Sequence, residues 1–167
     1  MLVHAAETRF QRGLEALEAG RGLEALALFE AALELERKLG SRTPQARYLS
    51  YYGLCLAIAG NRPREGVDLC KQAIALEFYN ADLCCNYGRV LLAADRRKDA
   101  YTAFIKGLKV QRGHQGILRE IAKMGWRRRP VLPFLDRRHP LNVALGKMFH
   151  PAAKPTEARA RTSGSAA

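Results

Sequence analysis

The sequence lacks the patterns that mark several common classes of protein. None of its apolar runs approaches the roughly 18 residues that a membrane-spanning helix needs, and no stretch alternates apolar and polar residues as a half-buried strand does. The N-terminal stretch Met1–Glu7 has no basic region followed by an apolar one. We therefore expect no signal peptide and a cytoplasmic location.

Side chains arranged for chemistry are scarce as well. The four cysteines include no C-x2-C pair, so the sequence predicts no zinc site, and without an export signal we expect reduced thiols. None of the four histidines has a carboxylate or a nucleophile at a helical spacing from which a catalytic dyad could form. No glycine-rich phosphate loop follows a strand. We predict no enzymatic activity, no metal and no cofactor.

The sequence does contain a glycine-centred pattern built from helix-forming residues. Gly88 lies inside one helical stretch, and Ala100, Phe104 and Gly107 follow it twelve, sixteen and nineteen residues later. The spacing of four and then three places a small, a large and a small residue on one face of a second helix. Two such helices joined by a polar turn make a hairpin that cannot bury its own apolar face, so copies of it are needed.

Two copies of this pattern lie upstream. The first copy has identical offsets, and the second has one additional residue in its turn. The equivalent residues are Gly13, Ala25, Phe29 and Ala32 in the first copy and Gly53, Gly66, Cys70 and Ala73 in the second. Three hairpins with a common register predict a repeat protein whose apolar stripes are buried between neighbouring hairpins.

This spacing resembles the tetratricopeptide repeat (TPR), in which W-x2-L-G-x2-Y is followed by A-x3-F, A and P, although the Trp and the final Pro are missing from all three copies. The resemblance implies an all-α protein, with a right-handed superhelix of helix-turn-helix repeats over residues 5–124. The repeats would span about 6–39, 46–80 and 81–114, and a cap helix over 114–124 would cover the last apolar face. We expect a basic, proline-rich segment with one short helix over 125–150 and a disordered tail over 151–167. We also expect the protein to be bacterial.

In TPR arrays the first helix of each repeat lines a concave groove that binds an extended or helical peptide. The resemblance implies that positions two, five, nine and twelve of these helices face the groove. Those positions hold Glu7, Phe10, Leu14, Leu17, Arg47, Ser50, Leu54, Ala57, Asp82, Cys85, Arg89 and Leu92. Phe10 and Leu14 stand where chaperone-binding repeats have a Lys and an Asn that hold a carboxylate, so that clamp is absent. The remaining mixture of apolar and charged residues suits an amphipathic peptide.

The cysteines divide between core and groove in this register. Cys70 takes the place of Phe29 and Phe104, and Cys84 takes the place of the consensus Trp, so both are predicted to be inert packing residues. Cys85 is the exception, because it points toward the expected groove.

Positive charge is concentrated near the C-terminus. The formal net charge is +12, and residues 115–167 hold eleven Lys and Arg against three Asp and Glu, whereas residues 1–40 hold five against seven. The residues of the basic segment are Trp126, Arg127, Arg128, Arg129, Arg137 and Arg138, with Phe134 as an alternative to Trp126 for an apolar anchor. Three interpretations stay open. The segment packs back onto the last helices, it contacts nucleic acid or an anionic lipid surface, or it is a linear motif for a partner protein or for the acidic first repeat of a second copy.

Taken together, the patterns favour a protein-interaction scaffold or adaptor that binds a peptide or helix of another protein in the groove. The alternative is a binder of nucleic acid or of an anionic membrane surface, acting through the arginine-rich segment. The array is also similar in size to bacterial secretion chaperones, which bind extended segments of their clients but do not have basic tails of this kind. Self-association is a further expectation for the basic segment.

Overall fold

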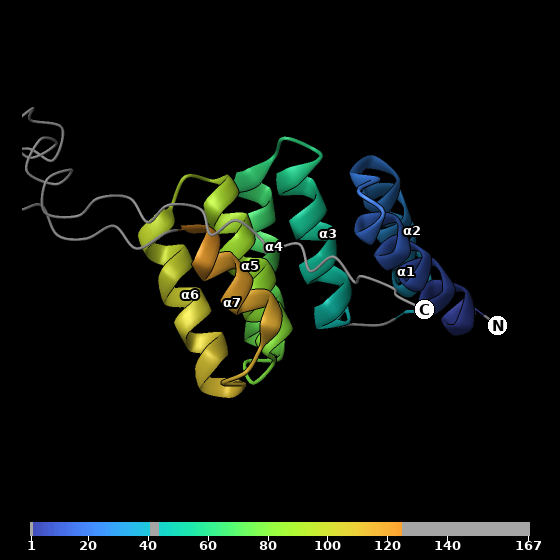
Figure 1. Ribbon diagram of the computed structural model, residues 1–167. Coiled ribbons are helices and arrows are strands. Elements are labelled where there is room, and N and C mark those ends of the chain that lie inside the picture. Colours follow the sequence, from blue (N-terminus) through green and yellow to red (C-terminus); the bar gives the residue numbers. More distant parts are fainter. Residues whose placement is uncertain (1, 41–43, 125–167) are drawn as a thin grey trace, which may run out of the picture. The chain divides into compact units, whose positions relative to one another are not determined.

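The computed structural model describes residues 2–40 and 44–124, and these residues form seven helices and no strand (Figure 1). In chain order the helices are α1 (Leu2–Glu18), α2 (Gly22–Lys38), α3 (Ala46–Ile58), α4 (Pro63–Leu76), α5 (Ala81–Ala93), α6 (Arg97–Val110) and α7 (Gln115–Met124). Within the described ranges, no helix has the length and apolar character needed to cross a bilayer. The predicted short helix after residue 125 and the tail over 151–167 lie outside the described residues.

The helices are arranged as consecutive hairpins. Three pairs of helices form hairpins: α1 with α2, α3 with α4, and α5 with α6. The first hairpin contacts the second where α2 packs against α3, and the second contacts the third where α3 and α4 pack against α5. Helix α7 packs against α5 and α6. The prediction of an all-α helical-repeat protein is confirmed, and each pair buries its apolar face against the next one.

In the first and third hairpins a phenyl ring lies over a glycine of the facing helix. Phe29 and Phe104 have no exposed surface. A Cβ atom added at Gly13 would lie 2.6 Å from the Phe29 ring, and one added at Gly88 would collide with the Phe104 ring. These glycines are required because any side chain would occupy the space that the ring fills. The shared register of Gly13 and Gly88 therefore reflects one packing arrangement used twice.

The middle hairpin replaces the ring by direct backbone contact. Cys70 stands in place of Phe29 and Phe104 and is fully buried. A Cβ atom added at Gly53 would lie 2.9 Å from the carbonyl oxygen of Gly66, and one added at Gly66 would collide with the carbonyl oxygen of Gly53. Two facing glycines and a small thiol let α3 and α4 approach more closely than a ring would permit.

The three hairpin turns share a local structure. Each contains one residue with positive φ, namely Gly20 (74°), Asn61 (53°) and Asp95 (58°), which are residue types that tolerate the left-handed region. The residue that follows is an arginine at the N-cap of the second helix, and it pairs with an acid three residues later. The three pairs are Arg21–Glu24, Arg62–Glu65 and Arg96–Asp99. The acids lie in the first helical turn, where the helix dipole favours negative charge.

Helix α7 covers the end of the third hairpin. Ile117 is fully buried, and a Cβ atom added at Gly107 of α6 would collide with its Cδ1 atom. At the other end of the helix, the Arg97 side chain donates a hydrogen bond to the Met124 carbonyl oxygen at 2.6 Å. Gly107 thus leaves space for the Ile117 side chain of α7, as Gly13 and Gly88 leave space for the phenyl rings.

Candidate binding surface

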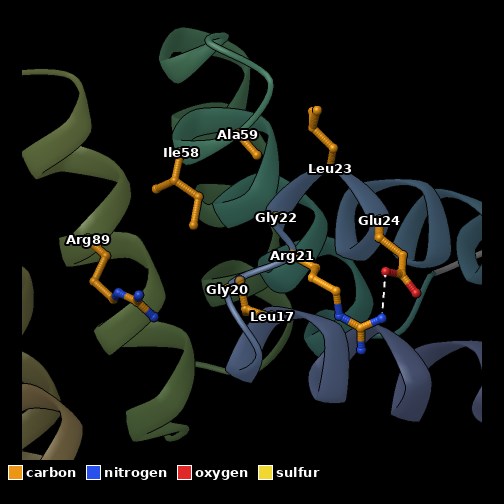
Figure 2. Close-up of a pocket in the computed structure, with 9 residues that line it drawn as sticks. All are labelled: Leu17, Gly20, Arg21, Gly22, Leu23, Glu24, Ile58, Ala59 and Arg89. Atoms are coloured by element: carbon orange, nitrogen blue, oxygen red, sulfur yellow. Dashed lines mark hydrogen bonds and ion pairs between the residues drawn. The ribbon is translucent and has the colours of Figure 1, made fainter.

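Side chains from all three hairpins line one open pocket of about 590 Å³. Its walls come from the end of α1 with the α1–α2 turn, the end of α3, and the middle of α5. The lining residues are Leu17, Gly20, Arg21, Gly22, Leu23, Glu24, Ile58, Ala59 and Arg89. Figure 2 shows Ile58 and Arg89 projecting toward the space beside the α1–α2 turn. Leu17 and Arg89, predicted from the register of two different repeats, therefore lie in the same pocket.

The pocket combines apolar surface with a guanidinium group. Leu23 is 70% exposed and Ile58 is 46% exposed, so both offer apolar contact area. The Arg89 side chain is 36% exposed, and its Nε atom lies 3.7 Å from Oε1 of Glu120 on α7. That distance is an ion pair but too long for a hydrogen bond, so the guanidinium N–H groups can still bind a ligand.

Five of the residues predicted to face a groove are buried. Phe10, Ser50, Leu54, Ala57 and Cys85 are each at most 7% exposed. These side chains therefore offer a ligand little or no contact surface. The structure therefore corrects the prediction that they line an open surface.

The physical reason is lateral packing of the first helices on one another. The Phe10 ring of α1 lies 4.7 Å from the Tyr48 ring and 5.5 Å from the Tyr51 ring of α3, measured between centroids. Between α3 and α5, the Ser50 hydroxyl accepts a hydrogen bond from the Asn86 side-chain amide at 3.1 Å. Aromatic rings between α1 and α3, and a hydrogen-bonded polar pair between α3 and α5, fill the space in which the repeat register predicts a ligand.

Two further predicted residues, Glu7 and Arg47, bind each other. The Glu7 carboxylate accepts hydrogen bonds from the Arg47 guanidinium and, at 2.8 Å, from the Tyr48 hydroxyl. The guanidinium also lies over the Phe10 ring, 5.1 Å from its centroid. Burial raises the pKa of Glu7, but hydrogen bonds from Gln11 and Tyr48 and the charge of Arg47 outweigh it and hold that pKa below its usual value. Burial, together with the hydrogen bond to Glu7, raises the pKa of Tyr48 to about 12.

The remaining predicted residues are partly accessible. Leu14 and Leu92 are half-buried against the first and second core clusters. The Asp82 side chain is 66% exposed, and its Oδ1 atom lies 2.8 Å from Nε2 of His114. Of the predicted set, the pocket in Figure 2 gathers Leu17 and Arg89, and the others lie outside its lining.

The thiols are packing groups. Burial raises the pKa of Cys55 and of Cys85 to about 11 and that of Cys70 to about 12, so all three are neutral thiols near pH 7. The prediction that Cys70 and Cys84 are buried is confirmed, and Cys85 is buried with them. Within residues 2–40 and 44–124, no cluster of three His, Cys, Asp or Glu residues could hold a metal ion.

His114 joins α5 to α7. Its Nδ1 atom accepts a hydrogen bond from the Ile117 backbone N–H at 3.1 Å, so the ring caps the N-terminus of α7. Nε2 must then carry the proton and donate to Asp82. The equivalent residue of the preceding repeat is Asn80, whose side chain accepts a hydrogen bond from the Asp82 backbone N–H and caps α5. A capping role for His114 could therefore have been inferred from its position in the repeat.

We expect His114→Ala to lower the free energy of unfolding by about 1 kcal/mol, the usual effect of losing a helix cap. His114→Asn should recover most of that loss, because asparagine already caps α5 at the equivalent position. Urea unfolding gives the energies, and hydrogen exchange at the α7 amides locates the effect. Equal losses for the two variants would mean that the ring stabilises α7 by packing alone.

Sequence reasoning missed part of the surface. Leu23 and Ile58 occupy no groove position of the repeat register, and the pocket forms where the end of α3 lies beside the α1–α2 turn. A signal did exist for that turn, since Arg-x-x-Glu or Arg-x-x-Asp recurs at every hairpin. The basic segment, Trp126 to Arg138, lies outside the described residues, and its three interpretations stay open.

Comparison with known proteins relates the chain to one fold. No family model matches the sequence, and no curated protein matches it. Among solved structures, the TPR domain of Arabidopsis OM64 matches with a TM-score of 0.59 and 14% sequence identity, over 74% of this chain and 97% of that one. At this level of identity the likeness concerns the arrangement of the helices.

Proposed function

We propose that this TPR-like repeat protein is a non-enzymatic adaptor that binds an amphipathic peptide or helix of another protein on the surface formed by the end of α1, the α1–α2 turn with the start of α2, the end of α3, and α5. The proposal rests on one observation. The open pocket of Figure 2 takes lining residues from three successive hairpins, so a ligand lying in it can contact more than one repeat. Surfaces that span several repeats are the usual binding sites of helical-repeat folds.

The lining indicates the chemistry of the ligand. Leu17, Leu23 and Ile58 offer an apolar wall, which suits an aliphatic or aromatic side chain of the peptide. Arg89 stands at one side, and although its guanidinium forms an ion pair with Glu120 at 3.7 Å, its N–H groups can donate a charge-assisted hydrogen bond to an acidic side chain. The Arg21 charge is already matched by Glu24 at 2.8 Å. A peptide that alternates apolar and acidic residues fits this arrangement best.

Peptides selected from a displayed random library should lose at least tenfold in affinity, or about 1.4 kcal/mol, when Ile58→Glu is introduced. The introduced carboxylate removes apolar contact area and repels the acidic residue of the peptide. Ile58 is 46% exposed, so the change should leave the fold intact. Isothermal titration calorimetry measures the affinities. Leu39→Glu is the control, because Leu39 is 41% exposed and lies outside the pocket lining.

Arg89→Gln should weaken the same peptides severalfold, and Arg64→Gln on the exposed face of α4 should not. The loss should shrink at high salt, because it reports a charge interaction. If the pocket variants and the two controls bind all selected peptides equally, the proposed binding surface is wrong.

A further inference from the structure

The turn between α4 and α5 exposes an unusual amount of apolar surface. Phe78 is 61% exposed and Tyr79 is 76% exposed, and their ring centroids lie 3.9 Å apart. Leu76, at the end of α4, is 44% exposed, and Val110, at the end of α6, is 41% exposed. Four large apolar or aromatic side chains therefore contact solvent at one edge of the array.

The fold does not require aromatic residues at this turn. In the third repeat the equivalent residues are Arg112 and Gly113, thirty-four positions later. The two backbones match, with φ −136° and ψ 80° at the C-cap of α4 and φ −137° and ψ 96° at the C-cap of α6. In the first repeat the corresponding residues, Arg37 and Lys38, still belong to helix α2, so that repeat has a different backbone there. Since an arginine and a glycine follow the same C-cap backbone at the end of α6, that backbone does not account for the aromatic pair at the end of α4.

The aromatic pair lines a pocket of about 720 Å³ together with two carboxylates. The lining residues are Leu76, Glu77, Phe78, Tyr79, Asn80, Ala81, Asp82, Val110 and Gln111. Glu77 accepts one hydrogen bond from the Asn80 side chain, and Asp82 accepts one from His114. Each carboxylate has further acceptor sites. None of the nine lining residues is basic, so the pocket presents aromatic faces and negative charge.

We propose that this pocket, formed by the α4–α5 turn and the end of α6, binds an arginine- or lysine-bearing segment of a partner protein. The cation of the partner lies over the Phe78 and Tyr79 rings and pairs with Glu77 and Asp82, and a neighbouring apolar side chain of the partner contacts Leu76. Aromatic faces attract cations through the ring quadrupole, and carboxylates add charge complementarity. An anionic lipid surface fits less well, because its headgroups would face both carboxylates.

This site is separate from the pocket of the proposed adaptor function. The two pockets share no lining residue. They also call for opposite partner charges, since Arg89 provides the charge in one and Glu77 and Asp82 in the other. Binding of a basic segment can therefore be tested without reference to the adaptor surface.

The test uses a fluorescein-labelled decapeptide of alternating leucine and arginine, with a leucine–glutamate decapeptide for comparison. The chain carries a net charge of +12, so non-specific attraction favours the acidic probe, and binding of the basic probe needs a local site. Fluorescence anisotropy with the full chain should show binding of the basic probe. Phe78→Gln combined with Tyr79→Gly should raise its Kd at least tenfold, and Glu77→Gln, which copies Gln111, should raise it severalfold.

Two control substitutions test whether the basic probe binds at this turn and nowhere else on the array. Tyr101→Ser removes an aromatic residue that is 49% exposed on α6 and should leave the Kd unchanged. Ile58→Glu should also leave it unchanged. The proposal is overturned if the basic probe fails to bind, if the aromatic double variant binds it like the original chain, or if the acidic probe binds equally well at this turn. Sedimentation equilibrium tests whether a second copy of the chain occupies the pocket instead. If the original chain is a dimer and the aromatic double variant is a monomer, the site belongs to a second copy and the proposal is overturned.

Discussion

Replacing Phe104 by alanine is expected to lower the free energy of unfolding by about 3–5 kcal/mol, the range found for large aromatic side chains removed from a core. The ring is fully buried between α5 and α6 and lies directly over Gly88, so its removal leaves a cavity that no flexible side chain borders on that side. Urea unfolding followed by circular dichroism measures the change. Tyr101→Ser, an exposed substitution on the same helix, should change the stability by less than about 0.5 kcal/mol.

The contact with Gly88 can be isolated by a double-mutant cycle. In the original chain, Gly88→Ala should destabilise by about 1–3 kcal/mol, because the new methyl group collides with the Phe104 ring. In the Phe104→Ala background the collision is gone, and the same substitution should stabilise by up to about 1 kcal/mol through helix propensity. The sign should therefore reverse. An effect of the same sign in both backgrounds would show that ring and glycine are not in contact.

The hairpins could be predicted from the sequence because they depend on local spacing. The spacing of four and then three around Phe29 and Phe104 reflects the 3.6-residue helical period within the second helix of each hairpin, and the structure buries both rings completely. Cys70, at the corresponding position of the second hairpin, is buried as predicted. These features need no information about how one hairpin packs on the next.

The binding surface could be predicted only in part, because exposure depends on contacts between repeats. Phe10 and Cys85 occupy groove positions in the repeat register, but both are buried, Phe10 against the Tyr48 and Tyr51 rings of α3 and Cys85 beside Gly116 of α7. Glu7 and Arg47 lie forty positions apart, and no local pattern indicates that they would pair. Ile58 lies outside the groove positions and is exposed in the pocket. A register fixes the direction of a side chain, whereas the volumes of its neighbours decide whether a ligand can contact it.

The second large effect is expected at the centre of the array. Gly66→Val should destabilise by about 3 kcal/mol or more, at or above the upper end of the usual range for overpacking. Its Cβ atom would collide with the carbonyl oxygen of Gly53 and lie 3.1 Å from Cβ of Ala57 and 3.3 Å from Cγ1 of Val90. A backbone carbonyl cannot rotate away as a side chain can, so α3 and α4 would have to separate.

The matched control for this substitution is Gly113→Val, because a Cβ atom at Gly113 meets no atom within 4 Å. It should change the stability by less than about 0.5 kcal/mol. Gly66→Ala should lie between the two, although alanine is present at the equivalent positions of the other hairpins, Ala25 and Ala100, where a phenyl ring holds the helices apart. If valine were tolerated equally at positions 66 and 113, α3 and α4 would not be in backbone contact, and the middle hairpin would pack through side chains as the other two do.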